Sequence, residues 1–309
     1  MTLPAVPSSL AHPPSASLRR AASDDQLLER AVVILGAPRS GTSMLGRLLA
    51  RHPDVAYLVE PRLTWKWGND AKSDVLRPAD ARPEVRAHLR RAFASAVRAA
   101  GRQRLLEKHP SNSLRMGFVD AVLPGCVFVH ILRDGIESAL SIRRFWQQHA
   151  RGIPRRRLAD RWRELSWRQA PHYVREAIRR VAPRSLQGVV GRPVWGPRLP
   201  GIEQMAQELD PLEIACLQWR TCVELACAYG RALPAERYLE IRLEDMSPET
   251  VARILDFARL PPSPEVLAGY AEEFDPSRTQ YHRSAAATAD EAICRAWLQP
   301  ALEWLGYGG

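Results

Sequence analysis

The chain has 309 residues, of which 46% are hydrophobic and 25% are charged, the composition of a soluble globular protein that can bury a full core. Its 18 glycines and 25 prolines follow no period, which excludes a fibrous or low-complexity protein. No apolar run approaches the ~20 residues that cross a bilayer, and residues 1–30 lack the apolar stretch of a secretory signal. We therefore expect a cytoplasmic protein.

Basic residues outnumber acidic ones, 44 to 34, for a formal net charge of +10. The excess lies in residues 142–198, where 15 arginines stand against three acidic residues and the local net charge is +12. Two interpretations stay open for this segment. It makes a weak contact with an anionic acceptor or surface, or it is an arginine-rich helical face exposed to solvent.

The chain contains five cysteines, none of them in a CxxC pair: Cys126, Cys216, Cys222, Cys227 and Cys294. The odd number fits a reducing compartment better than a disulfide framework. Three of them lie in one predicted helix, and no histidine is near them in sequence to complete a tetrahedral zinc site. We interpret them as small core residues.

The chain opens with a stretch rich in proline, serine and alanine, Met1 to about Ser23, that has no apolar period. This composition predicts a disordered tail, and we assign residues 1–28 to the tail and residues 29–309 to one domain. The domain begins with a β-branched run, AVVILG at 31–36, followed by the turn residues APRSGTS and by the apolar period of MLGRLLARH. This succession predicts strand, loop and helix.

Short apolar runs predict four more strands, at 55–60, 104–108, 126–132 and 238–243. Apolar residues at helical spacing predict helices at 83–100, 135–148, 211–232, 248–258, 263–273 and 289–305. Residues 148–235 contain no strand-like run and are expected to form a helical insertion, with further helices at 158–168 and 171–181. The alternation of strands and helices predicts an α/β fold, P-loop-like and three-layered, with a central parallel sheet.

The strongest local feature is Gly36-Ala-Pro-Arg-Ser-Gly-Thr-Ser43, between a buried strand and a helix. At such a junction, successive backbone N–H groups and the helix N-terminus converge on an anion. Gly41 lets the backbone approach closely, Thr42 and Ser43 offer hydroxyls, and Arg39 supplies a fixed positive fork. We therefore expect the loop to hold a phosphate. A nucleotide kinase or ATPase would carry GxxxxGK followed by Ser or Thr, and the GK pair is absent.

This loop resembles that of the sulfotransferases that use 3′-phosphoadenosine 5′-phosphosulfate (PAPS). In that family the sequence PRSGT, completed by a Ser or Thr, comes directly after the first strand. This motif binds the 5′-phosphosulfate. The resemblance assigns Arg39, Ser40, Gly41, Thr42 and Ser43 to the donor site.

HILRDGIESALSI at 130–142 resembles the family's 3′-phosphate motif, in which an arginine ends a strand and a serine follows eight residues later. Here these residues are Arg133 and Ser141. A 3′-phosphate needs a guanidinium and a hydroxyl, and both motifs stand at predicted strand ends, where α/β sheets bind ligands. The resemblance thus implies PAPS as co-substrate and no metal.

Glu60 closes a predicted strand after the HP turn at 52–53 and stands 21 residues beyond Arg39. Tyrosylprotein sulfotransferases and related bacterial enzymes place their catalytic glutamate at this spacing after a similar turn. The resemblance implies that Glu60 takes the proton of an acceptor hydroxyl or phenol. The alternative is a carboxylate that pairs with Arg62 or Lys66.

Lys108 stands in LLEKHP, where the family often has a lysine close to the transferring sulfuryl group. The resemblance implies that Lys108 stabilises charge on the leaving phosphate. His109 follows, near the position of the histidine base in cytosolic sulfotransferases, but the order here is KHP and not KTH. A share in the base role and a packing or capping role both stay open for His109.

The chain departs from the family pattern in two places. Where other members read YEDL it has Leu243, so the nucleotide contact of that tyrosine is lost or is replaced, for example by Arg242. SRTQYHRS at 277–284 stands where the family has basic residues that close over the 3′-phosphate, and Arg278 and Arg283 are both candidates.

Together the motifs predict transfer of a sulfuryl group from PAPS to a hydroxyl or phenol of an unidentified acceptor, with Glu60, Arg39 and Lys108 as catalytic residues. Two other classes stay open. A P-loop kinase or NTPase would use the loop at 36–43, and a non-catalytic polyanion-binding protein would use the charge at 142–198. The motifs are unrelated to that charge, so we expect no nucleic-acid partner.

Overall fold

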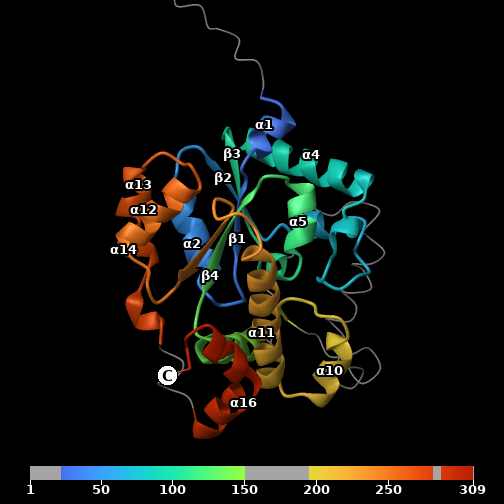
Figure 1. Cartoon of the computed structure of the whole chain (residues 1–309), viewed down its shortest axis with the longest axis vertical. Coiled ribbons are helices and arrows are strands. Elements are labelled where there is room, and N and C mark those ends of the chain that lie inside the picture. The colour runs from blue at the N-terminus through green and yellow to red at the C-terminus, as the bar shows by residue number, and fades with distance from the viewer. Residues whose placement is uncertain (1–21, 150–194, 281–286, 309) are drawn as a thin grey trace, which may run out of the picture.

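The computed structural model of this protein describes residues 22–149, 195–280 and 287–308. Within these residues, five strands form one parallel sheet in the order β2-β3-β1-β4-β5 (Figure 1). The strands are β1 (Val32–Leu35), β2 (Val55–Val59), β3 (Arg104–Lys108), β4 (Val127–Leu132) and β5 (Tyr238–Arg242). Because β1 pairs with β3 and β4, the carboxyl ends of these three strands meet at one edge. The predicted central parallel sheet is confirmed.

Helices cover both faces of the sheet, as its apolar strands require. Val32 and Ile34 of β1 pack with Leu45 in one cluster, whereas Val33 and Leu35 belong to another, because successive side chains of a strand point to opposite faces. One face carries α2 (Thr42–Leu49), α12 (Pro248–Phe257), α13 (Pro264–Ala268) and α14 (Tyr270–Glu273) (Figure 1). The other face carries α1 (Asp24–Leu28), α4 (Pro83–Ala99), α5 (Met116–Val122) and α11 (Pro211–Gly230). After β1 the chain therefore continues to the face that α2 covers, and after β3 it continues to the face that α5 covers.

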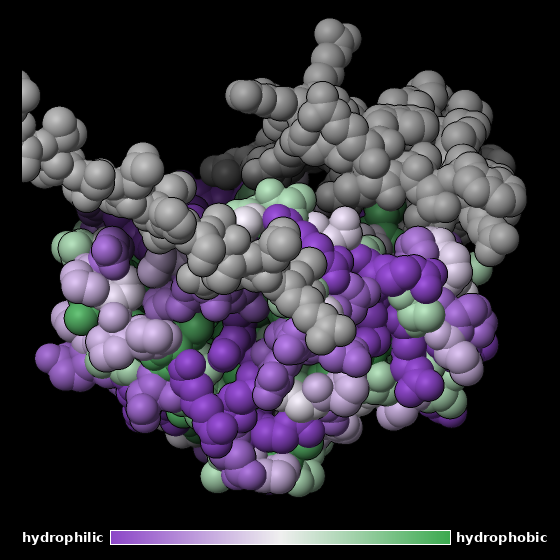
Figure 2. All heavy atoms as spheres, turned by 90° about the horizontal axis from the view of Figure 1, so that it is seen from above, coloured by the Kyte–Doolittle hydropathy of each residue, from purple (hydrophilic) through white to green (hydrophobic). Residues whose placement is uncertain are grey.

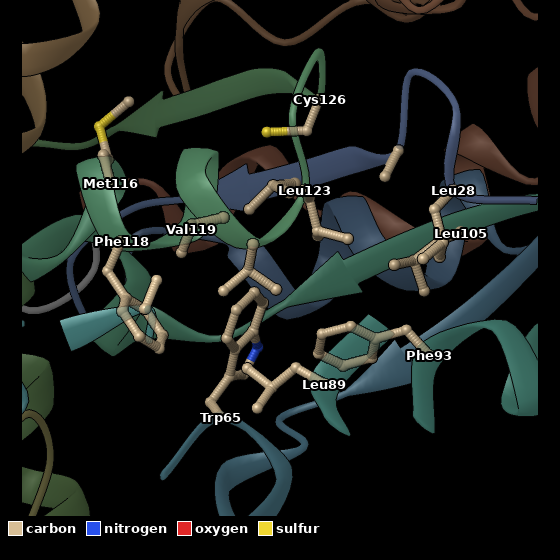
Figure 3. Packing of buried hydrophobic residues seen from close by; sticks show 14 of the residues in the cluster. Leu28, Trp65, Leu89, Phe93, Leu105, Met116, Phe118, Val119, Leu123 and Cys126 are labelled. Carbon is tan, nitrogen blue, oxygen red and sulfur yellow. The ribbon is translucent and has the colours of Figure 1, made fainter. Parts of the chain in front are cut away.

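The second face is packed around Trp65 of the short helix α3 (Arg62–Lys66) (Figure 3). The Trp65 ring centroid lies 4.8 Å from that of Phe93 on α4 and 6.1 Å from that of Phe118 on α5. Tilted and edge-on aromatic pairs of this kind are favourable. All three side chains are fully buried, so α3 and the turn that precedes it are held firmly on the sheet.

A third cluster lies at one end of the molecule, where α11 packs against α6 (Gly135–His149) and α16 (Thr288–Trp304). The cluster surrounds Trp219, and a Cβ at Gly135 would lie 2.9 Å from its ring, so the start of α6 needs a small residue. The remaining described elements are α10 (Ile202–Glu208) and the 3-10 turns η1 (Pro78–Asp80), η2 (Pro110–Leu114) and η4 (Pro276–Arg278).

The expected tail over residues 1–28 is wrong at its C-terminal end. Residues 24–28 form α1, capped by Ser23, whose Oγ accepts the Gln26 N–H at 3.2 Å. A capping box starts this helix. Its two apolar residues, Leu27 and Leu28, are buried against the core and anchor the helix there. Residues 1–21 lie outside the described residues.

Two further expectations need correction or qualification. The single helix expected at 263–273 is divided into α13 and α14, and Gly269 between them lies against Arg51, where a Cβ would come within 2.4 Å of its side chain. Within the expected insertion, α11 belongs to the core and contacts η2, α6 and α16. The helices expected at 158–168 and 171–181 lie outside the described residues.

Within the described ranges, no helix has both the length and the apolar character that crossing a membrane requires. Figure 2 shows one face of the molecule, on which hydrophilic residues predominate and hydrophobic residues form small, separate groups.

Candidate active site

The loop after β1 folds back on itself before α2 begins. Gly41 has φ +93° and is the N-cap of α2, and a Cβ there would lie 2.7 Å from Leu243 Cδ1, so both the left-handed backbone and the close contact favour glycine. Ser40 is buried and donates to a carbonyl within the loop at 2.7 Å. Thr42 and Ser43 form the first turn of α2. Its N–H groups and the Ser43 hydroxyl stand at the carboxyl end of β1, a position suited to an anion.

Lys108, at the end of β3, connects this loop to Glu60. Its Nζ donates to Ser43 Oγ at 2.9 Å and to Glu60 Oε1 at 2.5 Å. The Lys108 side chain is 1% exposed, whereas the Glu60 side chain is 48% exposed. A buried ammonium therefore lies between the anion loop and a carboxylate that solvent reaches. The structure brings together three residues that the sequence assigned to one site.

The backbone at Glu60 and Arg39 is left-handed, with φ of +49° and +69°. These are two of the four non-glycine residues with positive φ in the described part of the chain. Such backbone costs of order 1–3 kcal/mol and concentrates at functional sites. The Glu60 N–H donates to the Lys108 carbonyl at 2.8 Å, and the Glu60 carbonyl accepts from the Arg62 N–H at 2.6 Å. These bonds hold the turn in which the Glu60 carboxylate meets Lys108.

Arg133, directly after β4, is buried beside the same loop. Its Nη1 donates to the Arg39 carbonyl at 2.9 Å, and its Nη2 donates to Glu137 Oε2 at 3.0 Å. Nη2 also donates to the carbonyls of Arg278 and Thr279, at 2.6 and 3.0 Å. Burial lowers the pKa of Arg133, and the Glu137 carboxylate opposes this by favouring the charged form. The guanidinium is thus fixed in position and partly balanced in charge.

Ser141 meets Arg39 rather than Arg133. Arg39 Nε donates to Ser141 Oγ at 3.1 Å, and its guanidinium carbon lies 5.4 Å from the ring centroid of Phe145. Phe145 stands one turn after Ser141 on α6, and the ring of Trp195 lies 4.6 Å from it. Phe145 does not stand out in the sequence as a site residue, because an aromatic residue in an amphipathic helix normally indicates core packing.

His109 caps the turn η2. It is buried, and its Nδ1 accepts the Ser111 N–H at 3.1 Å, so the proton of the neutral ring is on Nε2. Burial lowers the pKa of His109 to about 3, helped by the positive charge of Arg115 and opposed by Glu60. A ring nitrogen with this pKa is a poor base near neutral pH. Of the roles that the sequence left open for His109, this arrangement corresponds to capping.

Arg242, the residue suggested in place of the family tyrosine, contacts the C-terminal segment of the chain. Arg242 lies over the Tyr307 ring, with 4.6 Å from its guanidinium carbon to the ring centroid, and donates to the Leu305 carbonyl. It therefore holds the segment after α16. Leu243 instead packs against Gly41 of the loop.

Of the two C-terminal arginines suggested for the 3′-phosphate, the structure describes Arg278 and not Arg283. The Arg278 side chain is 83% exposed and pairs with Asp275 at 3.1 Å. The backbone carbonyl of Arg278, and not its guanidinium, contacts Arg133. Arg283 lies outside the described residues, as do residues 150–194 of the arginine-rich segment.

The tertiary structure brings one cysteine to a histidine. Among the described residues, His130 on β4, Cys227 on α11 and Glu240 on β5 offer ligand atoms within 4.8 Å of one another. The Tyr238 hydroxyl already lies 2.7 Å from His130 Nδ1 and 2.8 Å from Glu240 Oε1, and Arg231 bonds both oxygens of Glu240. Hydrogen bonds therefore engage His130 Nδ1 and the Glu240 carboxylate, whereas His130 Nε2 is buried without a hydrogen-bond partner among the described residues. The expectation of no metal stays a prediction.

Comparison with known proteins identifies the family. A family model described as "Sulfotransferase family" matches residues 31–189, slightly more than half of the chain. The nodulation protein NoeE of Sinorhizobium fredii (strain NBRC 101917 / NGR234) is 29% identical over 137 residues, which cover 39% of this chain and 32% of that protein. The chain thus spans about a third of the length of this curated relative.

Two sulfotransferase domains of solved structure are among the similar proteins. The sulfotransferase domain from the curacin biosynthetic pathway has a TM-score of 0.50 at 14% identity, over 88% of this chain and 98% of that one. The sulfotransferase domain from the Synechococcus PCC 7002 olefin synthase has a TM-score of 0.48 at 17% identity, over 86% and 93%. On the family match over residues 31–189, this chain belongs to the sulfotransferase family.

Proposed function

We propose that this protein transfers a sulfuryl group from PAPS to a hydroxyl or phenol of an acceptor. The observation that carries the proposal is the position of Lys108, whose ammonium lies 2.9 Å from Ser43 of the anion loop and 2.5 Å from the Glu60 carboxylate. One buried cation thus contacts a group that can hold the donor and a group that can accept a proton. Membership of the sulfotransferase family supports this interpretation.

The donor is proposed to lie across the carboxyl ends of β1 and β4. The amides of the loop, with Arg39, Thr42 and Ser43, would bind the 5′-phosphosulfate. Arg133 and Ser141 would bind the 3′-phosphate. The hydrogen bonds of Arg39 to Ser141 and of Arg133 to the Arg39 carbonyl, 3.1 and 2.9 Å long, support one continuous site, because they connect the two phosphate motifs.

In the proposed reaction the acceptor oxygen attacks the sulfur in line with the bond to the 5′-phosphate. Glu60 takes the acceptor proton as the new S–O bond forms, and the bond to the bridging oxygen breaks, so that 3′-phosphoadenosine 5′-phosphate leaves. Lys108 stabilises the charge that develops on that oxygen. Glu60 is favoured over His109 as the base because its carboxylate is half exposed, whereas His109 is buried and uses Nδ1 for a cap. The likeness to tyrosylprotein sulfotransferases at Glu60 stays a prediction.

A cytoplasmic location is part of the proposal. All five cysteines are free thiols and buried, and the Cys216 thiol donates a hydrogen bond to Cys294 Sγ at 3.8 Å and forms no disulfide with it. Reduced thiols at this distance fit a reducing compartment. Contact of residues 142–198 with an anionic acceptor or surface is proposed on their charge alone.

Calorimetry with 3′-phosphoadenosine 5′-phosphate and adenosine 5′-phosphate tests the donor. We expect the first to bind about 10-fold or more tightly, since one charge-assisted phosphate contact contributes at least about 1.5 kcal/mol. Labelled PAPS with a panel of alcohols and phenols then tests transfer. Mg²⁺-dependent ATP turnover without PAPS binding would favour a kinase or NTPase, and salt-sensitive DNA binding without PAPS binding would favour a polyanion-binding protein.

A further inference from the structure

The residues that follow Lys108 form a buried polar turn. Within η2, Ser111, Asn112 and Ser113 are each at most 2% exposed. Buried hydroxyl and amide groups are costly unless they are hydrogen-bonded, and each of these side chains has a partner on a different segment. The turn therefore joins parts of the site that are far apart in the sequence.

Ser113 bonds the segment that enters the phosphosulfate loop. Its Oγ accepts the N–H of Gly36 at 3.1 Å, across 77 residues. Gly36 has little room to move, because a Cβ there would lie 2.7 Å from the Ile131 carbonyl and 2.5 Å from Ser40 Oγ. The first amide of the loop is thus directed at a side chain of η2.

Asn112 fixes η2 on the strand that carries Lys108. Its Nδ2 donates to Glu107 Oε2 at 2.6 Å, and its Oδ1 accepts from Arg115 Nε at 2.9 Å. The other oxygen of Glu107 accepts the indole N–H of Trp65 at 2.8 Å. Trp65 belongs to α3, which begins two residues after Glu60. Glu107 thus ties together η2, β3 and the helix that follows the proposed base.

Ser111 connects the same turn to a loop on the other side. Its Oγ donates to Asp74 Oδ2 at 2.7 Å, and the same oxygen accepts the Arg198 N–H at 2.9 Å. With Asn112 and Ser111 both held, the Ser113 hydroxyl has a fixed position from which to bond Gly36.

We infer that Ser113 is a positioning residue, which holds the Gly36 amide and so places the phosphosulfate loop relative to Lys108. The inference rests on the proposed function for the identity of the donor. It requires that loss of the Ser113 hydroxyl affect the 5′ end of the nucleotide, which the loop binds, and not the 3′ end.

The test compares Ser113→Ala with Ser138→Ala. Ser138 is a matched control, because it is also fully buried and its Oγ has no hydrogen-bond partner. Ser113→Ala is expected to weaken 3′-phosphoadenosine 5′-phosphate and adenosine 5′-phosphate by the same factor, about 3- to 10-fold, the range of one net hydrogen bond. The KM for PAPS rises and the KM for the acceptor stays. Ser138→Ala leaves all four quantities near wild type.

Hydrogen exchange gives a second readout that needs no ligand. Exchange in the peptide containing residues 36–41 is expected to be faster in Ser113→Ala than in wild type, and unchanged in Ser138→Ala. If exchange and nucleotide affinity both stay at wild-type values in a folded Ser113→Ala, the inference is overturned and Ser113 contributes to stability alone. If wild type does not bind the nucleotides, the proposed donor is wrong, and the exchange comparison still decides the role of Ser113.

Discussion

At the scale of single residues, the ion pair of Lys108 and Glu60 is asymmetric. The Lys108 side chain is 1% exposed and the Glu60 side chain 48%, so the ammonium has lost nearly all of its hydration and depends on protein partners, while the carboxylate keeps contact with solvent. Removing one partner of a buried pair leaves the other uncompensated. A substitution at Glu60 must therefore keep an oxygen for Lys108 if its effect is to report on chemistry.

Glu60→Gln meets this condition, because the amide oxygen can still accept from Lys108 whereas the basicity is lost. We expect kcat to fall by about 10²- to 10⁴-fold, the usual contribution of a positioned general base, with the nucleotide Kd within about threefold. The measurement is a pH profile of turnover together with nucleotide calorimetry. A carboxylate base gives an acidic limb that Glu60→Gln removes. Near-normal turnover in Glu60→Gln would mean that the acceptor is deprotonated in another way.

Arg133 needs a conservative substitution for a different reason. Truncation to alanine would leave the Glu137 carboxylate, which is 1% exposed, buried without its cation, at a cost of about 3–5 kcal/mol. Arg133→Lys keeps the charge but loses the planar fork that binds phosphate at two points. We expect about 10-fold or more weaker binding of 3′-phosphoadenosine 5′-phosphate, and adenosine 5′-phosphate within about threefold. Equal weakening of both ligands in calorimetry would make Arg133 structural and the 3′-phosphate assignment wrong.

At the scale of elements, the position of α2 depends on one glycine. A Cβ at Gly46 would lie 2.1 Å from Tyr57 Oη on β2, so the helix that carries the loop approaches the sheet edge more closely than any other residue would allow. Gly46→Ala is expected to displace α2 and to lower stability by about 1–3 kcal/mol, more than the gain in helix propensity returns. Chemical denaturation measures this. Tyr57→Ala removes the obstructing ring, so adding Gly46→Ala to that variant should cost no further stability. A double variant that is clearly less stable than Tyr57→Ala alone would contradict this explanation.

The turn η2 makes stability depend on pH through His109. Its pKa is lowered to about 3 by burial, below the ~6.5 of an exposed histidine. The unfolded chain therefore binds more protons between these values, and stability is lost as pH falls from about 6.5 toward 3, by at most about 1.4 kcal/mol per pH unit. His109→Asn keeps a capping oxygen but cannot titrate.

Unfolding free energies of wild type and His109→Asn are therefore expected to diverge below about pH 6.5, the unperturbed histidine pKa, with the variant less sensitive to acid. Turnover of His109→Asn near neutral pH should stay close to wild type if Glu60 is the base. Parallel stability curves would show that His109 is not held neutral by the fold.

At the scale of the whole molecule, the charge is concentrated in one stretch of sequence. Residues 142–198 carry a net charge of +12, whereas the whole chain carries +10. The remaining residues together are therefore slightly acidic. Arg155, Arg156 and Arg157 lie within it and outside the described residues. Changing all three to glutamate is expected to raise the KM of an anionic acceptor by about 3- to 10-fold at low salt, and less at high salt, with donor affinity kept. Unchanged acceptor kinetics would identify a solvated face.

Much of this architecture could be predicted from local pattern. VVIL, RLLEK and VFVHIL became neighbouring strands, because runs that are buried on both faces suit a parallel sheet. The glycine and hydroxyl residues between β1 and α2 indicated an anion site, since backbone direction at such a junction follows from the adjacent elements. The helix at 24–28 escaped notice because its five residues are too few for a periodic signal, although Ser23 and Gln26 form a capping box.

Contacts between distant residues were decided by the tertiary structure alone. The sequence determined that Glu60, Lys108 and the loop stand at strand ends, but the sheet order, with β3 between β2 and β1, is what brings Lys108 within bonding distance of both Glu60 and Ser43. The bond from Gly36 to Ser113 and the meeting of His130 with Cys227 span 77 and 97 residues. Periodicity shows which face of an element is buried, whereas the partner across an interface depends on how whole elements pack, and that information is absent from any short stretch of sequence.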